Sequence, residues 1–190
     1  MNLDARARRV AALSLGLLVA ATHGQHDLTA LHLPPATWAA FFLGGLLLQR
    51  AGWWVLGLAL VGLLDTIAIR WGGVSDFCIS PAYLFMIPAY GTLWIAGRMA
   101  SRHLHWQLRH GLVVAACLGS ILIAETLASG SFYLFSGKVA QAGLAGLPVY
   151  LVTWAPATLE AFAFWMGASA LAGGALLLLR GAGVLPRRSA

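Results

Sequence analysis

The sequence contains little charge. Of its 190 residues, 60% are hydrophobic and only 9% are charged, and the mean hydropathy is +0.81. A soluble domain usually carries about 25% charged residues, so this composition excludes an ordinary water-soluble fold and indicates a membrane protein. The net charge of +6 does not indicate nucleic-acid binding, because no basic stripe with interleaved aromatic residues is present.

Cysteine is also scarce. The two cysteines, Cys78 and Cys117, have no C-x-x-C spacing, which excludes a zinc site or a disulfide framework of the usual pattern. Cys117 lies in an apolar run, where a free cysteine most often packs as a small hydrophobic side chain. The nucleotide-binding pattern G-x-x-x-x-G-K-[ST] is missing, so this chain cannot itself drive transport with ATP.

The chain does contain a series of apolar segments with short connections. We predict a single all-α integral membrane domain over residues 1–190, with six transmembrane helices. The first segment follows three arginines and imitates a signal peptide, but we interpret it as a short transmembrane helix. The expected spans are about 10–21, 36–48, 53–69, 82–96, 111–128 and 149–179.

The basic residues predict the orientation of this bundle. Six spans place both termini on one side of the membrane. With the termini in the cytoplasm, ten of the twelve basic residues are cytoplasmic and only Arg70 and Lys138 lie outside, as the positive-inside rule requires. We therefore expect a multi-pass protein of the bacterial inner membrane, with its substrate site facing the periplasm.

The connection between the third and fourth spans combines several chemically active residues in one short stretch. It reads Arg-Trp-Gly-Gly-Val-Ser-Asp-Phe-Cys-Ile-Ser-Pro-Ala-Tyr over residues 70–83. Cys78 stands beside Asp76 and Phe77 in this connection, where a thiol has little reason to serve packing alone. A soft thiolate is a good ligand for a transition metal, and one cysteine suits an axial position on a metal already held by a macrocycle. This indicates a haem or a corrinoid.

Three acids in the outward halves of their spans predict a polar pocket. Asp65, Glu125 and Glu160 would be costly to bury in lipid, so such residues usually face a cavity or a partner. The alternative is that each acid pairs with Arg70 or with a helix end near the interface. Tyr83 is expected either to donate to a ligand or to serve as an interfacial aromatic residue.

Two polar stretches outside the spans complete the expected site. Tyr133 falls in residues 129–148, which we expect to fold over the pocket as a cap. The stretch 22–35 contains His23, His26 and His32. Its histidines either bind a metal or are simply solvated, since they lack a fixed i, i+4 spacing. A catalytic thiol needs a nearby base, and His26 or His32 is a candidate to fold over Cys78.

These features resemble the substrate-binding S-components of energy-coupling-factor (ECF) vitamin transporters, and within them the solitary BtuM-type cobalamin transporters. The resemblance covers the whole chain, and is carried by Asp65, the run Asp-Phe-Cys-Ile-Ser-Pro at 76–81, and Tyr83. It implies that the substrate is a corrinoid, cobalamin or cobinamide, and that there is no intrinsic cofactor. It further implies that Cys78 ligates the corrin cobalt axially and helps to displace cyanide from cyanocobalamin.

Other interpretations stay open at this point. The chain could be an S-component-like carrier for another vitamin, or a membrane haem or thiol enzyme that uses Cys78 as ligand or nucleophile. The small residues Ala12, Gly16 and Ala20 share one helix face. Such a face serves either internal packing or the docking of an ECF energising module.

Overall fold

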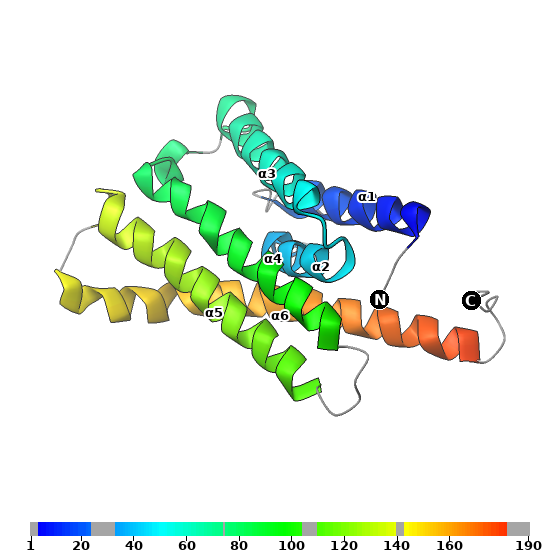
Figure 1. Cartoon of the computed structure of the whole chain (residues 1–190). Coiled ribbons are helices and arrows are strands. Elements are labelled where there is room, and N and C mark those ends of the chain that lie inside the picture. Colours follow the sequence, from blue (N-terminus) through cyan, green and yellow to red (C-terminus); the bar gives the residue numbers. More distant parts are fainter. Residues whose placement is uncertain (1–3, 24–32, 74, 104–109, 140–142, 182–190) are drawn as a thin grey trace.

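The computed structural model describes residues 4–23, 33–73, 75–103, 110–139 and 143–181 (Figure 1). Within these ranges the chain forms α-helices and short 3-10 segments and no strand, which confirms the all-α class. Six α-helices are present, and each overlaps one predicted span. In order, the elements are α1 (Ala5–Thr22), α2 (Thr37–Leu47), α3 (Ala51–Trp71), η1 (Asp76–Cys78), η2 (Pro81–Phe85), α4 (Met86–His103), α5 (His110–Phe135), η4 (Leu144–Gly146) and α6 (Leu147–Gly181).

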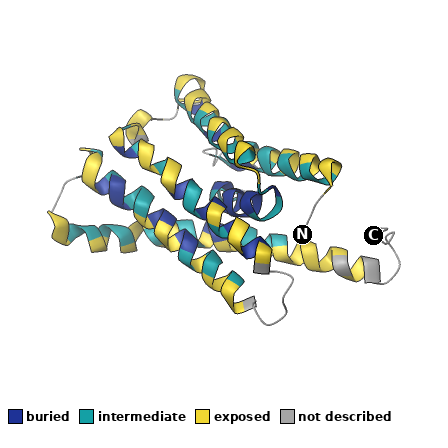
Figure 2. Cartoon of the chain, viewed as in Figure 1, coloured by how far each residue is buried: buried dark blue, intermediate teal, exposed yellow. Residues whose placement is uncertain are grey.

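Three of the helices are long and apolar enough to cross a membrane. They cover Ala51–Trp71, Gly111–Phe135 and Leu144–Leu176. Large apolar side chains on them are exposed, for example Leu63 and Leu171, and Figure 2 shows that α3 and α6 are exposed along much of their length. Apolar surface of this extent is typical of contact with lipid rather than water, so the chain has the character of a membrane protein.

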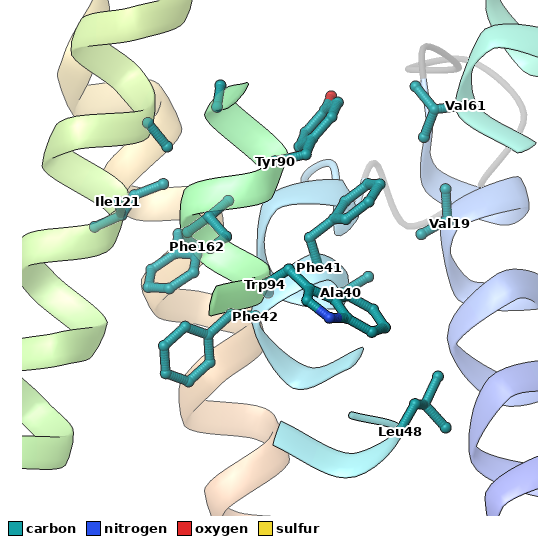
Figure 3. Packing of buried hydrophobic residues seen from close by; sticks show 14 of the residues in the cluster. Val19, Ala40, Phe41, Phe42, Leu48, Val61, Tyr90, Trp94, Ile121 and Phe162 are labelled. Atoms are coloured by element: carbon teal, nitrogen blue, oxygen red, sulfur yellow. The ribbon is translucent and has the colours of Figure 1, made fainter. Parts of the chain in front are cut away.

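The buried core forms around α2, which is the shortest helix and the most completely buried (Figure 2). Phe41 stacks on Tyr90 of α4 with ring centroids 4.3 Å apart, and Phe42 meets Phe162 of α6 edge-on at 6.1 Å. Figure 3 shows Phe41 and Trp94 packed side by side, with Val19 on the adjacent α1. An 11-residue helix without a charge is therefore held by packing on several of its sides.

Glycines bring α2 and α4 into direct backbone contact. A Cβ atom on Gly45 would lie 2.0 Å from the carbonyl oxygen of Trp94, and one on Gly97 would lie 2.0 Å from that of Phe42. No side chain fits at either position. Small residues at a helix crossing allow the close approach on which association of helices in lipid depends.

The two ends of the bundle differ in their residues. Helix α1 begins and α6 ends at the right of Figure 1, whereas α5 ends and α6 begins at the left. The turn between α2 and α3 lies beside the C-terminal end of α4, because the Gln49 side-chain amide donates to the Ser101 hydroxyl at 3.2 Å. Arginines at 9, 50, 98 and 102 thus share one end. Asp65, η1 and η2 lie towards the other.

The fifth helix is longer than expected. Helix α5 continues to Phe135, so the first part of the predicted cap over 129–148 is helical instead. The Ser129 hydroxyl bonds Glu125 and the Ser131 hydroxyl bonds the carbonyl of Ala128. Both hydroxyls bond to the preceding turn of the same helix, so these serines are compatible with a helix and α5 continues through them.

Candidate functional site

A chain of hydrogen bonds around Asp65 joins four elements of the bundle. On α3, Asp65 Oδ1 lies 2.8 Å from His23 Nε2, and Asp65 Oδ2 accepts the phenolic hydrogen of Tyr83 at 2.5 Å. The other ring nitrogen of His23 lies 2.8 Å from Thr37 Oγ1. A single carboxylate therefore links the end of α1, the start of α2, the C-terminal half of α3 and η2.

Local structure places each of these groups. His23 is the C-cap of α1, and its backbone N–H donates to the carbonyl of Val19. Thr37 is the first residue of α2, and the neighbouring Ala36 N–H donates to the Thr22 hydroxyl at 3.0 Å. The end of α1 and the start of α2 are thus held together before either side chain reaches Asp65.

The electrostatics of the cluster follow from its partial burial. The side chain of His23 is 14% exposed and that of Asp65 29%. Burial, followed by the hydrogen bond and the negative charge of Asp65, raises the pKa of the Tyr83 phenol in η2 above its ordinary value, so Tyr83 remains a donor at neutral pH. An ionised carboxylate accepts through about four lone-pair sites, so Asp65 retains acceptor capacity for a ligand.

The connection that carries Cys78 has a defined backbone. Ser75 caps η1 by accepting from the N–H of Phe77, and the Ile79 N–H donates to the Asp76 carbonyl at 2.8 Å. Cys78 ends this 3-10 turn, and Pro81 opens η2 in the first-turn position that proline favours. The backbone of Cys78 thus lies at the end of a short turn, five positions before Tyr83.

Lys138 binds this turn from the far end of α5. Its Nζ donates to the carbonyls of Asp76 and Ile79 at 3.2 and 3.4 Å, which stand on either side of Cys78 in the sequence. The same ammonium lies 5.3 Å from the ring centre of Phe77, within the range of a cation–π contact. Phe77 also packs against Phe132 of α5 at 5.5 Å. The sequence did not indicate this role for Lys138, because 60 residues separate it from Cys78.

The other predicted site residues have separate surroundings. Glu125 is buried on α5 and accepts from Ser129 one turn later, whereas Glu160 is exposed on α6. Among the described residues no hydrogen bond or ion pair joins either acid to Asp65. Tyr133 is buried on α5 and donates to the Gly143 carbonyl at 2.7 Å. His26 lies outside the described residues.

His23 is the residue that sequence reasoning missed. The solvated interpretation of the histidine-rich stretch is wrong for this residue, which is mostly buried and hydrogen-bonded through both ring nitrogens. The available signal was its place directly after the first apolar span, in a connection expected on the same side of the membrane as the Asp65 end of the third span. Within the described part of the chain, no group of three or more His, Cys, Asp or Glu residues is arranged to hold a free metal ion.

Comparison with known proteins adds no identification. No protein-family model matches this chain, and no curated protein does.

Proposed function

We propose that this protein takes up a corrinoid, cobalamin or cobinamide, across the bacterial inner membrane. The observation that carries the proposal is the η1 turn, which ends at Cys78. It lies close in sequence to Tyr83, the partner of Asp65, and Lys138 donates to its backbone. A thiol on a short ordered turn suits axial ligation of a metal that a macrocycle already holds. An acid with free acceptor sites suits the amide groups at the rim of a corrin ring.

The proposed orientation follows from the charges at the two ends of the bundle. In this proposal all six helices belong to one transmembrane bundle, in which the 11-residue α2 is enclosed by its neighbours. Both termini lie in the cytoplasm and the end with η1 faces the periplasm. The arginines at 9, 50, 98 and 102 share the opposite end. This arrangement satisfies the positive-inside rule. Uptake of a periplasmic substrate requires an outward site of this kind.

The proposed chemistry at Cys78 is a ligand exchange on cobalt. The Cys78 thiolate donates an electron pair and forms the cobalt–sulfur bond. The cobalt–carbon bond to cyanide breaks, and its electron pair leaves with the cyanide. The proton lost from the thiol ends on the cyanide as hydrogen cyanide, and cobalt keeps its oxidation state. Asp65, Tyr83, Asp76 and Phe77 serve as contacts for the corrinoid in this proposal, and its metal is part of the substrate.

A spectroscopic titration tests the ligation directly. Purified protein is titrated with cyanocobalamin while the visible absorption of the corrin is recorded, for wild type, Cys78→Ser and Cys117→Ser. We expect a shift of the corrin bands for wild type and Cys117→Ser and none for Cys78→Ser. Cys117, half-buried on α5, is a matched control because it removes a thiol away from η1.

The other outcomes of this titration separate the alternatives. Binding without a band shift in any variant would retain a corrinoid site and remove the thiolate from it. No binding at all would favour a carrier for another vitamin, and absorption from haem in the protein as isolated would favour the haem protein.

The energy source belongs to the same proposal. The chain has no nucleotide-binding pattern, so it acts alone or with an ECF energising module docked on the face of Ala12, Gly16 and Ala20. Ala12 and Gly16 line a cavity between α1 and the neighbouring helices and are partly buried, which favours the packing interpretation of this face. Co-purification with an energising module is the measurement that decides between the two.

A further inference from the structure

An apolar cavity of about 360 Å³ lies between α1, α2, α3 and α4, and its lining includes none of the residues around Asp65. This volume is in the range of small-molecule sites, which begins at about 300 Å³. Leu13 on α1 and Leu56 on α3 line the cavity and are also strongly exposed. The cavity therefore reaches the outer surface of the bundle, where a membrane protein meets lipid.

Two polar groups interrupt this apolar lining. Arg9 is exposed on α1 and is the charged residue of the lining, and it has no ion pair among the residues that the structure describes. Trp94 on α4 is 5% exposed, and its indole Nε1 is buried without a hydrogen-bond partner. Buried donors are almost always paired in proteins. Two further buried groups, Trp54 Nε1 and Ser80 Oγ, also have no partner among the described residues, but only Trp94 belongs to a residue that lines this cavity, so its donor is available to a ligand there.

The positions of these groups along their helices are consistent with one ligand. Arg9 lies at the end of the bundle that also carries Arg98. Trp94 precedes Arg98 by four residues, which is about 6 Å along a helix. Trp94 therefore lies about one turn of α4 further into the bundle than Arg98, and the apolar wall continues from it past Phe41 to Val61 (Figure 3).

We propose that this cavity binds an anionic phospholipid of the surrounding leaflet, independently of the corrinoid function. Arg9 binds the lipid phosphate, the Trp94 indole donates to an ester carbonyl at the acyl–glycerol boundary, and one acyl chain fills the cavity beside Gly16. The depth of the donor below the arginine matches the order of phosphate, ester and chain in such a lipid. Positive charge at the rim matches the negative head group.

Native mass spectrometry of detergent-purified full-length protein tests this site. The protein is titrated with phosphatidylglycerol or with zwitterionic phosphatidylcholine, and the bound lipids are counted. We expect one phosphatidylglycerol to bind more tightly than any phosphatidylcholine. Arg9→Gln should weaken that binding about fivefold, since one basic residue near a membrane surface contributes about 1 kcal/mol. The matched control Arg6→Gln removes an exposed arginine outside the lining and should have little effect.

Two further variants test the depth of the site. Gly16→Leu fills the cavity from α1 and should abolish the tight binding of phosphatidylglycerol. The first added atom, Cβ, would lie at an ordinary contact distance of 3.8 Å from the Leu60 side chain. Trp94→Phe keeps an aromatic ring, removes the donor and should weaken binding severalfold. Helix content by circular dichroism and a single monomer peak on gel filtration establish that each variant is folded.

Three outcomes would overturn the proposal. Equal binding of phosphatidylglycerol and phosphatidylcholine would show that Arg9 does not select an anionic head group. Equal weakening by Arg6→Gln and Arg9→Gln would show that only the overall positive charge of the protein matters. A dimer in the wild-type mass spectrum that disappears in folded Gly16→Leu, with lipid binding unchanged, would show that a second copy of this chain occupies the cavity.

Discussion

Tyr83 donates a hydrogen bond to Asp65, 18 positions earlier in the sequence, and so closes the connection that carries Cys78. The bond joins the C-terminal half of α3 to η2 directly before α4 begins. Everything between the two residues, including the turn η1, is thereby confined to a loop with fixed ends. Cys78 ends η1 within this loop and belongs to none of the α-helices.

We expect Tyr83→Phe to destabilise the fold. A hydrogen bond to a charged group contributes about 1.5–3 kcal/mol, and the partial exposure of Asp65 places this one at the lower end. For a chain of this length that corresponds to a decrease of about 3–6 °C in Tm. Thermal unfolding in detergent is the measurement.

A double-mutant cycle tests whether the effect acts through Asp65. Tyr83→Phe and Asp65→Asn should be non-additive by at least about 0.5 kcal/mol, because they remove two ends of one interaction. Thr153→Val serves as the control, since the Thr153 hydroxyl bonds the carbonyl of Val149 within α6. Additivity in both cycles would contradict the direct link.

We expect Lys138→Met to loosen the turn that carries Cys78. The variant loses two hydrogen bonds from Nζ to η1 and the contact with Phe77. These groups are exposed, so the cation–π contact contributes only about 0.5–1 kcal/mol and the exposed bonds a little more. Hydrogen exchange of the amides at 77–79 should accelerate about fivefold.

Lys138→Arg provides the control for this experiment. Arginine keeps the positive charge and donors at the same position, so it should preserve most of the protection of η1. Unchanged exchange in Lys138→Met, measured by mass spectrometry of the peptide over 75–80, would show that η1 holds its conformation without the lysine.

Alanine at the crossing of α2 and α4 should destabilise the bundle. In Gly45→Ala the new methyl group would lie 2.0 Å from the Trp94 carbonyl oxygen, so the two backbones must separate. Overpacking of this kind costs about 1–3 kcal/mol. We expect a lower Tm in detergent for Gly45→Ala and likewise for Gly97→Ala.

Gly62→Ala is the matched control for the crossing. Gly62 lies within α3, and an added Cβ would meet no atom within 4 Å. Alanine favours a helix over glycine by about 1 kcal/mol, so this variant should be neutral or more stable. Equal losses at Gly45 and Gly62 would show that the crossing is not the cause.

Reporter fusions test the proposed orientation. Alkaline phosphatase fused after Lys138 should be active, because this position is expected in the periplasm. The same enzyme fused after Arg102 should be inactive, and a fluorescent protein at the C-terminus should fluoresce. These outcomes follow from the distribution of the arginines. The reverse pattern would place η1 in the cytoplasm and remove the basis for uptake from the periplasm.

Asp65 and Tyr83 could be singled out from the sequence because they carry strong local signals, whereas the hydrogen bond between them could not. Asp65 is an acid within an apolar span, and Tyr83 follows a proline that starts a new segment. In the structure, Tyr83 donates a hydrogen bond to Asp65. Glu125 carried the same signal, but its oxygen is used by Ser129 one turn away. A serine four residues later on the same helix can satisfy the acid with a hydrogen bond, so an acid within a span need not face a pocket.

The sequence by itself determined the helices, because apolar segments of this length bury their backbone groups in only one way, within themselves. It also determined the contrast between the arginine-bearing end and the end with Cys78. The tertiary structure alone decided which side chains meet. His23 reaches Asp65 over 42 positions, and Lys138 reaches the carbonyls on either side of Cys78 over about 60. Such pairs have no sequence signal, since they depend on how the helices pack and not on the period within any one of them.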